Sequence, residues 1–170
     1  EAYPVKLFAA VLFKEPGSAE KCRDMLAGAF GPLDYTSPET LFDVTDYYEK
    51  EMGSPLYRVL VSFEKTTSPS ELPDIKLKCV SIEEALRKSG NRTVNIDSGY
   101  LDYDKVVLAS TKKGPYKIYM DKGIWADMTL HYEKGGFLPF SWTFADFKDG
   151  RYNAFLLRIR ELYKKSLHSS

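Results

Sequence analysis

The stretch Val5–Phe13, VKLFAAVLF, is a nearly continuous apolar run with the length of a β-strand. Such a run is typical of a central strand that is covered on both faces, because a strand with one exposed face alternates apolar and polar residues. After a turn at residues 14–17, apolar residues recur at helical spacing as far as Phe30, and Gly31 and Pro32 end this helix. The chain therefore begins with a buried strand and a helix.

Two further strands are predicted downstream, over Thr40–Thr45 and Tyr57–Glu64, and the second is rich in β-branched and aromatic residues. Residues 68–71, SPSE, then have the form of a capping box with proline at the first helical position. The apolar residues after this box stand three or four apart, which predicts one helix to about Lys88: Leu72, Ile75, Cys79, Ile82 and Leu86.

A competing interpretation of the same segment is a strand over residues 75–79 and a new helix from Ser81. The helical spacing accounts for more residues than the strand spacing does, so one helix is favoured. Arg92–Ile96 is predicted as a fourth strand, and residues 97–99 as a turn.

The last third of the chain is predicted to add a hairpin and a final helix. Residues 102–109 fit a short helix, with a strand over 106–110 as the alternative. The hairpin spans residues 116–132 around Asp121–Gly123, and the helix carries its apolar face over residues 152–163.

The predicted order of elements indicates the fold class. The first six run strand, helix, strand, strand, helix, strand, which matches the split β-α-β pattern of ferredoxin-like folds. We therefore expect an α+β fold in a single domain over residues 1–170, with a ferredoxin-like core that is extended by a β-hairpin and a C-terminal helix.

The composition disfavours several classes of protein. Lysine and arginine number 24, as do aspartate and glutamate, so the formal net charge is zero. Nucleic acids and anionic membranes attract excess positive charge and are disfavoured as partners. No apolar run near the start approaches the ~20 residues of a membrane span. Two cysteines without C-x-x-C spacing make neither a disulfide framework nor a four-ligand zinc site, and we expect a cytoplasmic protein.

The common catalytic motifs are absent from the sequence. There is no G-x-x-x-x-G-K-[ST] phosphate loop, no G-x-G-x-x-G after a strand, no G-x-S-x-G and no H-E-x-x-H. Two segments instead combine acids with tyrosines, TDYYEKEMG at Thr45–Gly53 and NIDSGYL at Asn95–Leu101. We expect both to line one pocket for a small anionic ligand or a metal. The structural alternatives are a helix cap with aromatic packing for the first segment and an Asx-type turn for the second.

Individual residues of these segments suit different roles. The candidates for acid–base chemistry are Asp46, Glu51, Asp97 and Lys105. The candidates for ligand binding are Tyr47, Tyr48, Asn95, Tyr100 and Lys112. Carboxylate oxygens suit a divalent metal, with Asp46 and Asp97 as its candidate ligands. The sequence identifies no cofactor.

Two weaker clusters accompany these segments. Lys105 and residues 110–113, STKK, suit a phosphate or a carboxylate, with an exposed basic turn as the alternative. Asp127, Thr129 and His131 share one face of a strand. The first and last of these three lie roughly 13 Å apart along the backbone, so they line a groove or an outer face rather than chelate one ion.

An alternative function is a protein-interaction or structural module. Aromatic residues make up 14% of the chain, and five of them lie in one predicted loop region: Phe137, Phe140, Trp142, Phe144 and Phe147. Aromatic side chains are common interface anchors, so the sequence is also compatible with a homo-oligomer. The competing interpretation is that this loop folds back over the sheet and belongs to the core.

Several stretches resemble one family of proteins. They include FGPLD at residues 30–34, TDYYEKEMG at 45–53, NIDSGYL at 95–101, KVVLASTK at 105–112 and GGFLPFSWTFADF at 135–147. The chain resembles the domain-of-unknown-function family 4416, a prokaryotic family, over nearly its whole length. The resemblance implies no established reaction. Some members carry the label "GTP-binding protein", but the sequence has neither a phosphate loop nor an N-K-x-D motif.

Overall fold

Residues 1–169 are described by the computed structural model, which shows an α+β architecture in which helices pack on one antiparallel sheet of nine strands. The central strand is β1 (Val5–Phe13), which pairs with β4 (Leu56–Thr67) on one side and with β5 (Val94–Leu101) on the other. Every residue of β1 is buried, so the prediction of a central strand covered on both faces is confirmed.

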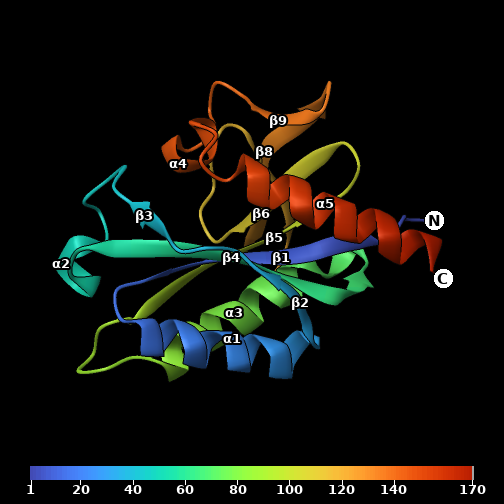
Figure 1. Ribbon diagram of the computed structural model, residues 1–170. Coiled ribbons are helices and arrows are strands. Elements are labelled where there is room, and N and C mark those ends of the chain that lie inside the picture. Colours follow the sequence, from blue (N-terminus) through green and yellow to red (C-terminus); the bar gives the residue numbers. More distant parts are fainter. Residues whose placement is uncertain (170) are drawn as a thin grey trace.

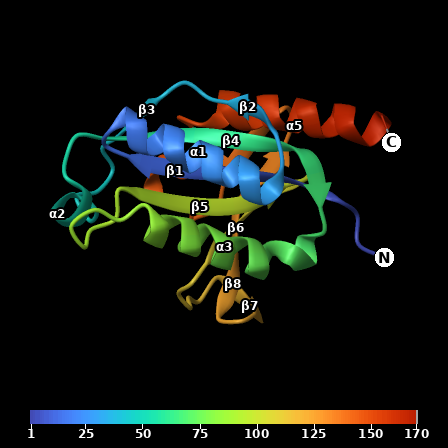
Figure 2. The same cartoon turned by 90° about the horizontal axis from the view of Figure 1, so that it is seen from below.

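Helices cover both faces of this part of the sheet. α1 (Pro16–Phe30) and α3 (Leu72–Ala85) lie side by side on one face, and α5 (Asn153–His168) crosses the opposite face (Figures 1 and 2). The single helix predicted from residue 68 is confirmed as a short 3₁₀ turn, η1 (Pro69–Glu71), that leads into α3. None of the described helices is long and apolar enough to cross a membrane.

The outer edge of β4 is covered by two short strands. β2 (Leu33–Thr36) and β3 (Thr40–Phe42) pair with successive parts of β4. The predicted strand over Thr40–Thr45 is thus shorter than expected, and β2 was not predicted. β2 is partly exposed and lies between prolines, so its four residues carry no alternating apolar pattern.

Beyond β5 the sheet continues in the order β5-β6-β8-β7, with β9 also paired to β8. The bounds of these strands are β6 Lys105–Ser110, β7 Lys117–Asp121, β8 Ile124–Glu133 and β9 Gly136–Pro139. The hairpin of β7 and β8 is confirmed, and its two-residue turn has positive φ at Lys122 and Gly123, as a type I′ turn requires. The remaining helices are short: α2 Glu49–Met52 and α4 Ala145–Lys148.

Two predictions for the middle of the chain are wrong. Residues 97–99 do not form a turn, because β5 continues straight through them to Leu101. Residues 102–109 do not form a helix, and the strand alternative is correct, since β6 buries Val106 and Val107 in the sheet. Asp102 instead closes the tight turn between the strands by accepting hydrogen bonds from the backbone N–H groups of Asp104 and Lys105.

Gly99 explains how β6 approaches β5. A Cβ atom at this position would lie 2.3 Å from the carbonyl oxygen of Val107 and 2.9 Å from a side-chain carbon of Leu108. Only glycine therefore allows the two backbones to approach so closely. The strands pair over three residues each, Gly99–Leu101 with Val106–Leu108, and then part. Figure 2 shows β6 and β8 running across the direction of β1 and β4.

Gly99→Ala is expected to lower the free energy of unfolding by about 1–3 kcal/mol, the usual cost of overpacking, because the new methyl group meets the backbone of β6. Urea unfolding followed by circular dichroism measures this change. Gly28→Ala in α1 is the matched control, since nothing lies within 4 Å of its added methyl group. Equal stability of the two variants would contradict the proposed close approach of β5 and β6.

Candidate functional site

The candidate site is a cleft that opens where β5 and β6 part. It consists of two adjoining hollows, the polar hollow of about 300 Å³ and the aromatic hollow of about 450 Å³. The polar hollow is lined by Tyr47, Tyr48, Lys76, Val80, Glu83, Arg92, Asn95, Asp97, Ala109, Ser110, Thr111 and Lys112. The aromatic hollow is lined by Thr45, Tyr47, Tyr48, Arg58, Asp97, Leu108, Ala109, Ser110, Lys112, Lys117, Asp127, Phe144, Asp146 and Phe147.

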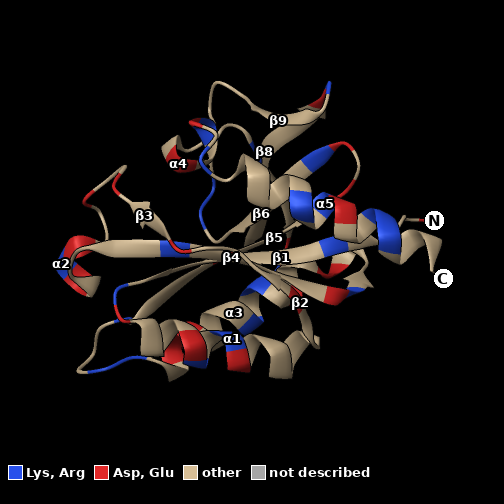
Figure 3. Ribbon diagram, viewed as in Figure 1, with Lys and Arg blue, Asp and Glu red and all other residues tan. Residues whose placement is uncertain are grey.

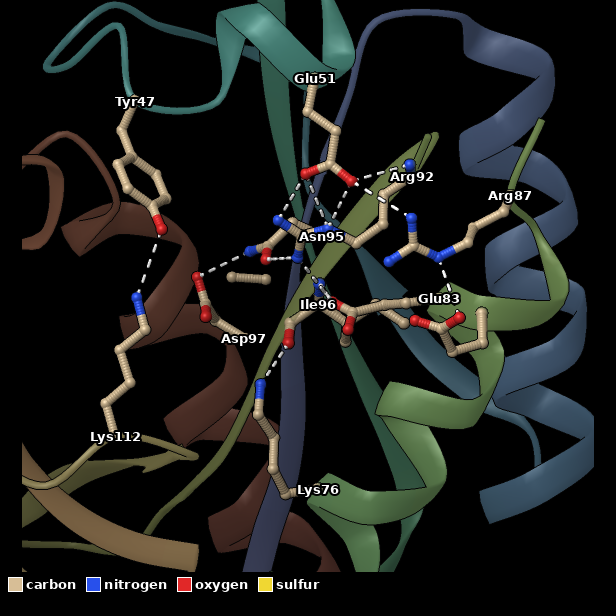
Figure 4. A network of polar contacts seen from close by, with 12 residues as sticks. Tyr47, Glu51, Lys76, Glu83, Arg87, Arg92, Asn95, Ile96, Asp97 and Lys112 are labelled. Atoms are coloured by element: carbon tan, nitrogen blue, oxygen red, sulfur yellow. Dashed lines mark hydrogen bonds and ion pairs between the residues drawn. The ribbon is translucent and has the colours of Figure 1, made fainter. Parts of the chain in front are cut away.

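Two side chains of α3 bond to the part of β5 that β6 leaves unpaired. The ammonium group of Lys76 donates to the carbonyl oxygen of Ile96 at 2.8 Å, and the N–H of Ile96 donates to Glu83 at 2.7 Å (Figure 4). Both polar side chains are buried, with exposed fractions of 7% and 6%. Burial raises the pKa of Glu83. The two side chains satisfy backbone groups that a paired strand would otherwise satisfy.

A buried arginine lies beneath the aromatic hollow. The guanidinium of Arg58, in β4, forms ion pairs with Asp97 at 2.9 Å and with Asp146 at 3.3 Å. Tyr152 donates to Asp146 at 2.7 Å, and this aspartate is fully buried. Burial raises the pKa of Asp146. Burial opposes ionisation of Asp97 as well, but the positive charges of Arg58 and Lys76 outweigh it and hold the pKa of Asp97 below its usual range.

A second arginine joins α2 to β5. Arg92 donates to Glu51 from its backbone N–H at 2.9 Å, from Nε at 3.0 Å and from Nη2 at 2.9 Å. Its Nη1 donates to Asn95 at 2.9 Å, so the pair also orients an amide of the cleft (Figure 4). Hydrogen bonds from Arg92 lower the pKa of Glu51 despite the partial burial of the carboxyl group.

Tyr47 and Lys112 meet where the two hollows adjoin. The ammonium group of Lys112 donates to the Tyr47 hydroxyl at 3.3 Å and lies 5.3 Å from the centre of its ring. Figure 4 shows these side chains reaching toward each other from opposite sides, with Asp97 nearby. Tyr48 packs edge-on against Tyr47 at 5.0 Å, and burial raises the pKa of Tyr48 to about 12.

The structure brings together most of the candidate residues for acid–base chemistry and for ligand binding. Five of them line the cleft: Tyr47, Tyr48, Asn95, Asp97 and Lys112. Glu51 stands beside the cleft as the partner of Arg92. The segments Thr45–Gly53 and Asn95–Leu101 therefore lie close together, although about fifty residues separate them in sequence.

Three predicted residues lie elsewhere. Asp46 lines a different hollow, between β3 and α2, whereas Asp97 lines the cleft. Lys105 forms an ion pair with Asp102 at 2.7 Å at the far end of β6. Tyr100 packs beside buried apolar residues that include Leu72 and Val107. Among residues 1–169, no three His, Cys, Asp or Glu side chains gather in a way that could hold a metal ion.

Several residues of the cleft were not predicted from the sequence as residues of a ligand site: Arg58, Lys76, Lys117, Asp146 and Phe144. Two of them carried a usable signal. Arg58 is a charge inside the otherwise apolar stretch of residues 56–61, and Lys76 stands on the same helix face as Leu72. A charged residue at a position that the apolar pattern predicts to be buried requires a partner. Buried charges with such partners are often found at functional sites. Of the strand-face cluster at 127, 129 and 131, only Asp127 lines the cleft.

Comparison with known proteins identifies one family. A family model described as "Domain of unknown function (DUF4416)" matches residues 3–163. No curated protein and no solved structure matches the chain.

Glu51→Gln is expected to lower the free energy of unfolding at pH 7 by about 1–2 kcal/mol, because it removes charge-assisted hydrogen bonds to Arg92. The folded-state pKa of Glu51 lies below its ordinary value of 4.5. The stabilisation is therefore complete at neutral pH and is lost as the pH falls from about 4.5 through the folded-state pKa. Urea unfolding at pH 7 and at pH 3 measures the difference.

Glu49→Gln is the matched control, since Glu49 is exposed on the same short helix and its side chain has no hydrogen bond among the described residues. Its stability should follow the unmodified protein at both pH values. A Glu51→Gln deficit as large at pH 3 as at pH 7 would show that packing, rather than the ion pair, joins α2 to β5.

Proposed function

The chain belongs to the DUF4416 family, and we propose that its cleft between β5 and β6 binds a small anionic ligand. One observation carries this proposal. Three lysines line the cleft, and within residues 1–169 each is hydrogen-bonded only to neutral oxygens: Lys76, Lys112 and Lys117. Both arginines of the cleft, by contrast, are paired with carboxylates.

The acidic residues of the cleft are already occupied. Five basic and four acidic side chains line the two hollows. Arg58 holds Asp97 and Asp146, while the N–H of Ile96 holds Glu83. Asp127 is the fourth: burial raises its pKa and the charge of Lys117 lowers it, but the two side chains form no ion pair. Among residues 1–169, Lys76, Lys112 and Lys117 form no ion pair with a carboxylate, and an anion would supply such a direct partner.

The chemistry of the polar hollow favours a phosphate or carboxylate group. Lys76 and Lys112 both line it, and so do Thr111 and Tyr47, whose side chains carry hydroxyl groups that can donate. Charge-assisted hydrogen bonds from such groups are stronger than neutral ones. The charge of the molecule as a whole gives no such indication, since Figure 3 shows basic and acidic residues mixed over the helices and loops.

We also infer that the first six major elements form a ferredoxin-like split β-α-β unit. The strand order β2-β4-β1-β5, with antiparallel pairing throughout, supports this inference. The position of α1 and α3 on one face of these strands supports it as well.

A second candidate function, self-association through exposed aromatic residues, has its own observation. Twelve large hydrophobic side chains are exposed among residues 1–169, and seven of them lie between residues 116 and 144. Tyr116, Trp142 and Phe140 stack on one another there, with ring centres 4.5 and 4.6 Å apart. Phe137 and Phe147 are buried, so only part of the predicted aromatic loop is available to a partner. Exposed apolar groups of this kind mark interaction surfaces when they are contiguous.

Lys112→Gln is expected to weaken binding of inorganic phosphate by about 10–100-fold, the usual effect of losing a charge-assisted hydrogen bond. Isothermal titration calorimetry with phosphate measures the change. Lys113→Gln is the matched control, because Lys113 is exposed in the same loop and lines neither hollow. Failure of phosphate, pyrophosphate and citrate alike to bind the unmodified protein would overturn the proposed function.

Ile118→Lys is expected to abolish self-association, because Ile118 is 74% exposed on β7 and a charge there disfavours an apolar contact. Sedimentation equilibrium over a range of protein concentrations reports the association. Leu41→Lys, at an exposed apolar residue outside this region, should leave it unchanged. A strictly monomeric unmodified protein at millimolar concentration would exclude the second candidate.

A further inference from the structure

We propose that the anion bound by the cleft is the head of a larger ligand whose body is an aromatic ring. The inference rests on the proposed function and extends it to the class of ligand. The anionic head would occupy the polar hollow, and the ring would occupy the aromatic hollow beside Tyr47 and Phe144. The simplest ligand of this kind is an aryl phosphate monoester, which carries one aromatic ring and one phosphate group.

The aromatic hollow has apolar walls that protein atoms leave uncovered. Tyr47 is 64% exposed and Phe144 is 54% exposed, and both line this hollow. Leu108 and Phe147 add apolar surface to it. Two large aromatic side chains held in solvent at the same hollow favour a partner that buries them, since burial of apolar area is favourable.

The two hollows adjoin closely enough for one ligand to enter both. They share six lining residues: Tyr47, Tyr48, Asp97, Ala109, Ser110 and Lys112. Their volumes, about 300 and 450 Å³, are within the range of small-molecule sites. A ring in one hollow and a phosphate in the other therefore needs no long linker.

The contact between Tyr47 and Lys112 can rearrange for such a ligand. In the structure the Lys112 ammonium group bonds the Tyr47 hydroxyl, a neutral acceptor, on the exposed side of the cleft. A phosphate oxygen is a stronger acceptor for an ammonium group and would replace that hydroxyl. The ring of Tyr47 would then be available to stack on the ligand ring, an interaction worth about 0.5–1.5 kcal/mol beyond the area that it buries.

Isothermal titration calorimetry with phenyl phosphate and methyl phosphate tests the inference, because both are monoesters with similar charge and only the first carries a ring. We expect phenyl phosphate to bind the unmodified protein at least about tenfold more tightly. Phe144→Ala should reduce phenyl phosphate affinity toward that of methyl phosphate, so that the ratio of the two affinities falls toward one.

Two further variants separate the role of the ring from general effects on the fold. Leu138→Ala is the matched control, because Leu138 is an exposed apolar residue that lines neither hollow. Tyr47→Phe keeps the ring and should keep the preference for phenyl phosphate, whereas Tyr47→Ala should lose it. Thermal unfolding of each variant identifies any that fails to fold.

The outcomes distinguish this inference from the function on which it rests. Equal affinities for the two esters in the unmodified protein would overturn the aromatic ligand and leave the anion site intact. A preference for phenyl phosphate that survives both Phe144→Ala and Tyr47→Ala would place the ring elsewhere and overturn the inference as well. Absence of binding by both esters and by inorganic phosphate would remove the anion site, and the inference with it.

Discussion

The guanidinium group of Arg58 is the interaction on which the arrangement of the site depends. It lies in β4, is 2% exposed, and pairs with Asp97 of β5 and with Asp146 of α4. It also donates to the carbonyl oxygen of Ala10 in β1, and stacks on the ring of Phe42 at 5.1 Å. One cation thus joins the centre of the sheet to the segment that covers it. Because Asp146 is fully buried, loss of Arg58 would leave an uncompensated buried carboxyl group, which costs far more than an exposed one.

The cleft exists because the sheet is incomplete at this point. β5 keeps its full pairing with β1, but β6 leaves it after three residues. Backbone groups on the free side of β5 would then be buried without partners, and Lys76 and Glu83 of α3 satisfy those of Ile96. Because Lys76 bonds this backbone group, its ammonium group also lines the polar hollow. A structural requirement of the sheet therefore also creates positive charge at the site.

Local patterns in the sequence predicted the elements that local physics determines. β1, α3 and the β7–β8 hairpin were found because apolar period, capping residues and turn residues act over a few positions. Gly99 was misinterpreted as part of a turn, because its role is to allow the close approach of β6, a contact that no local pattern records. The sequence did suggest that Tyr47 and Asp97 line one pocket. It did not reveal Lys76 or Asp146, because their positions depend on how α3 and α4 pack on the sheet.

The arginines and the lysines of the cleft have different roles. The arginines form ion pairs within the protein, whereas the lysines can bind an anion. Arginine presents a planar fork that matches a carboxylate, and Arg58 and Arg92 both hold acidic side chains. Lysine is a compact charge on a flexible stem, and among the described residues the three lysines of the cleft donate hydrogen bonds only to carbonyl and hydroxyl oxygens. A chain with a net charge of zero can therefore still offer a cationic site, because among the described residues the arginines form the ion pairs with the local acids and the three lysines form none. It is this pattern of pairing, more than total charge, that determines whether an anion is attracted to a cleft of this kind.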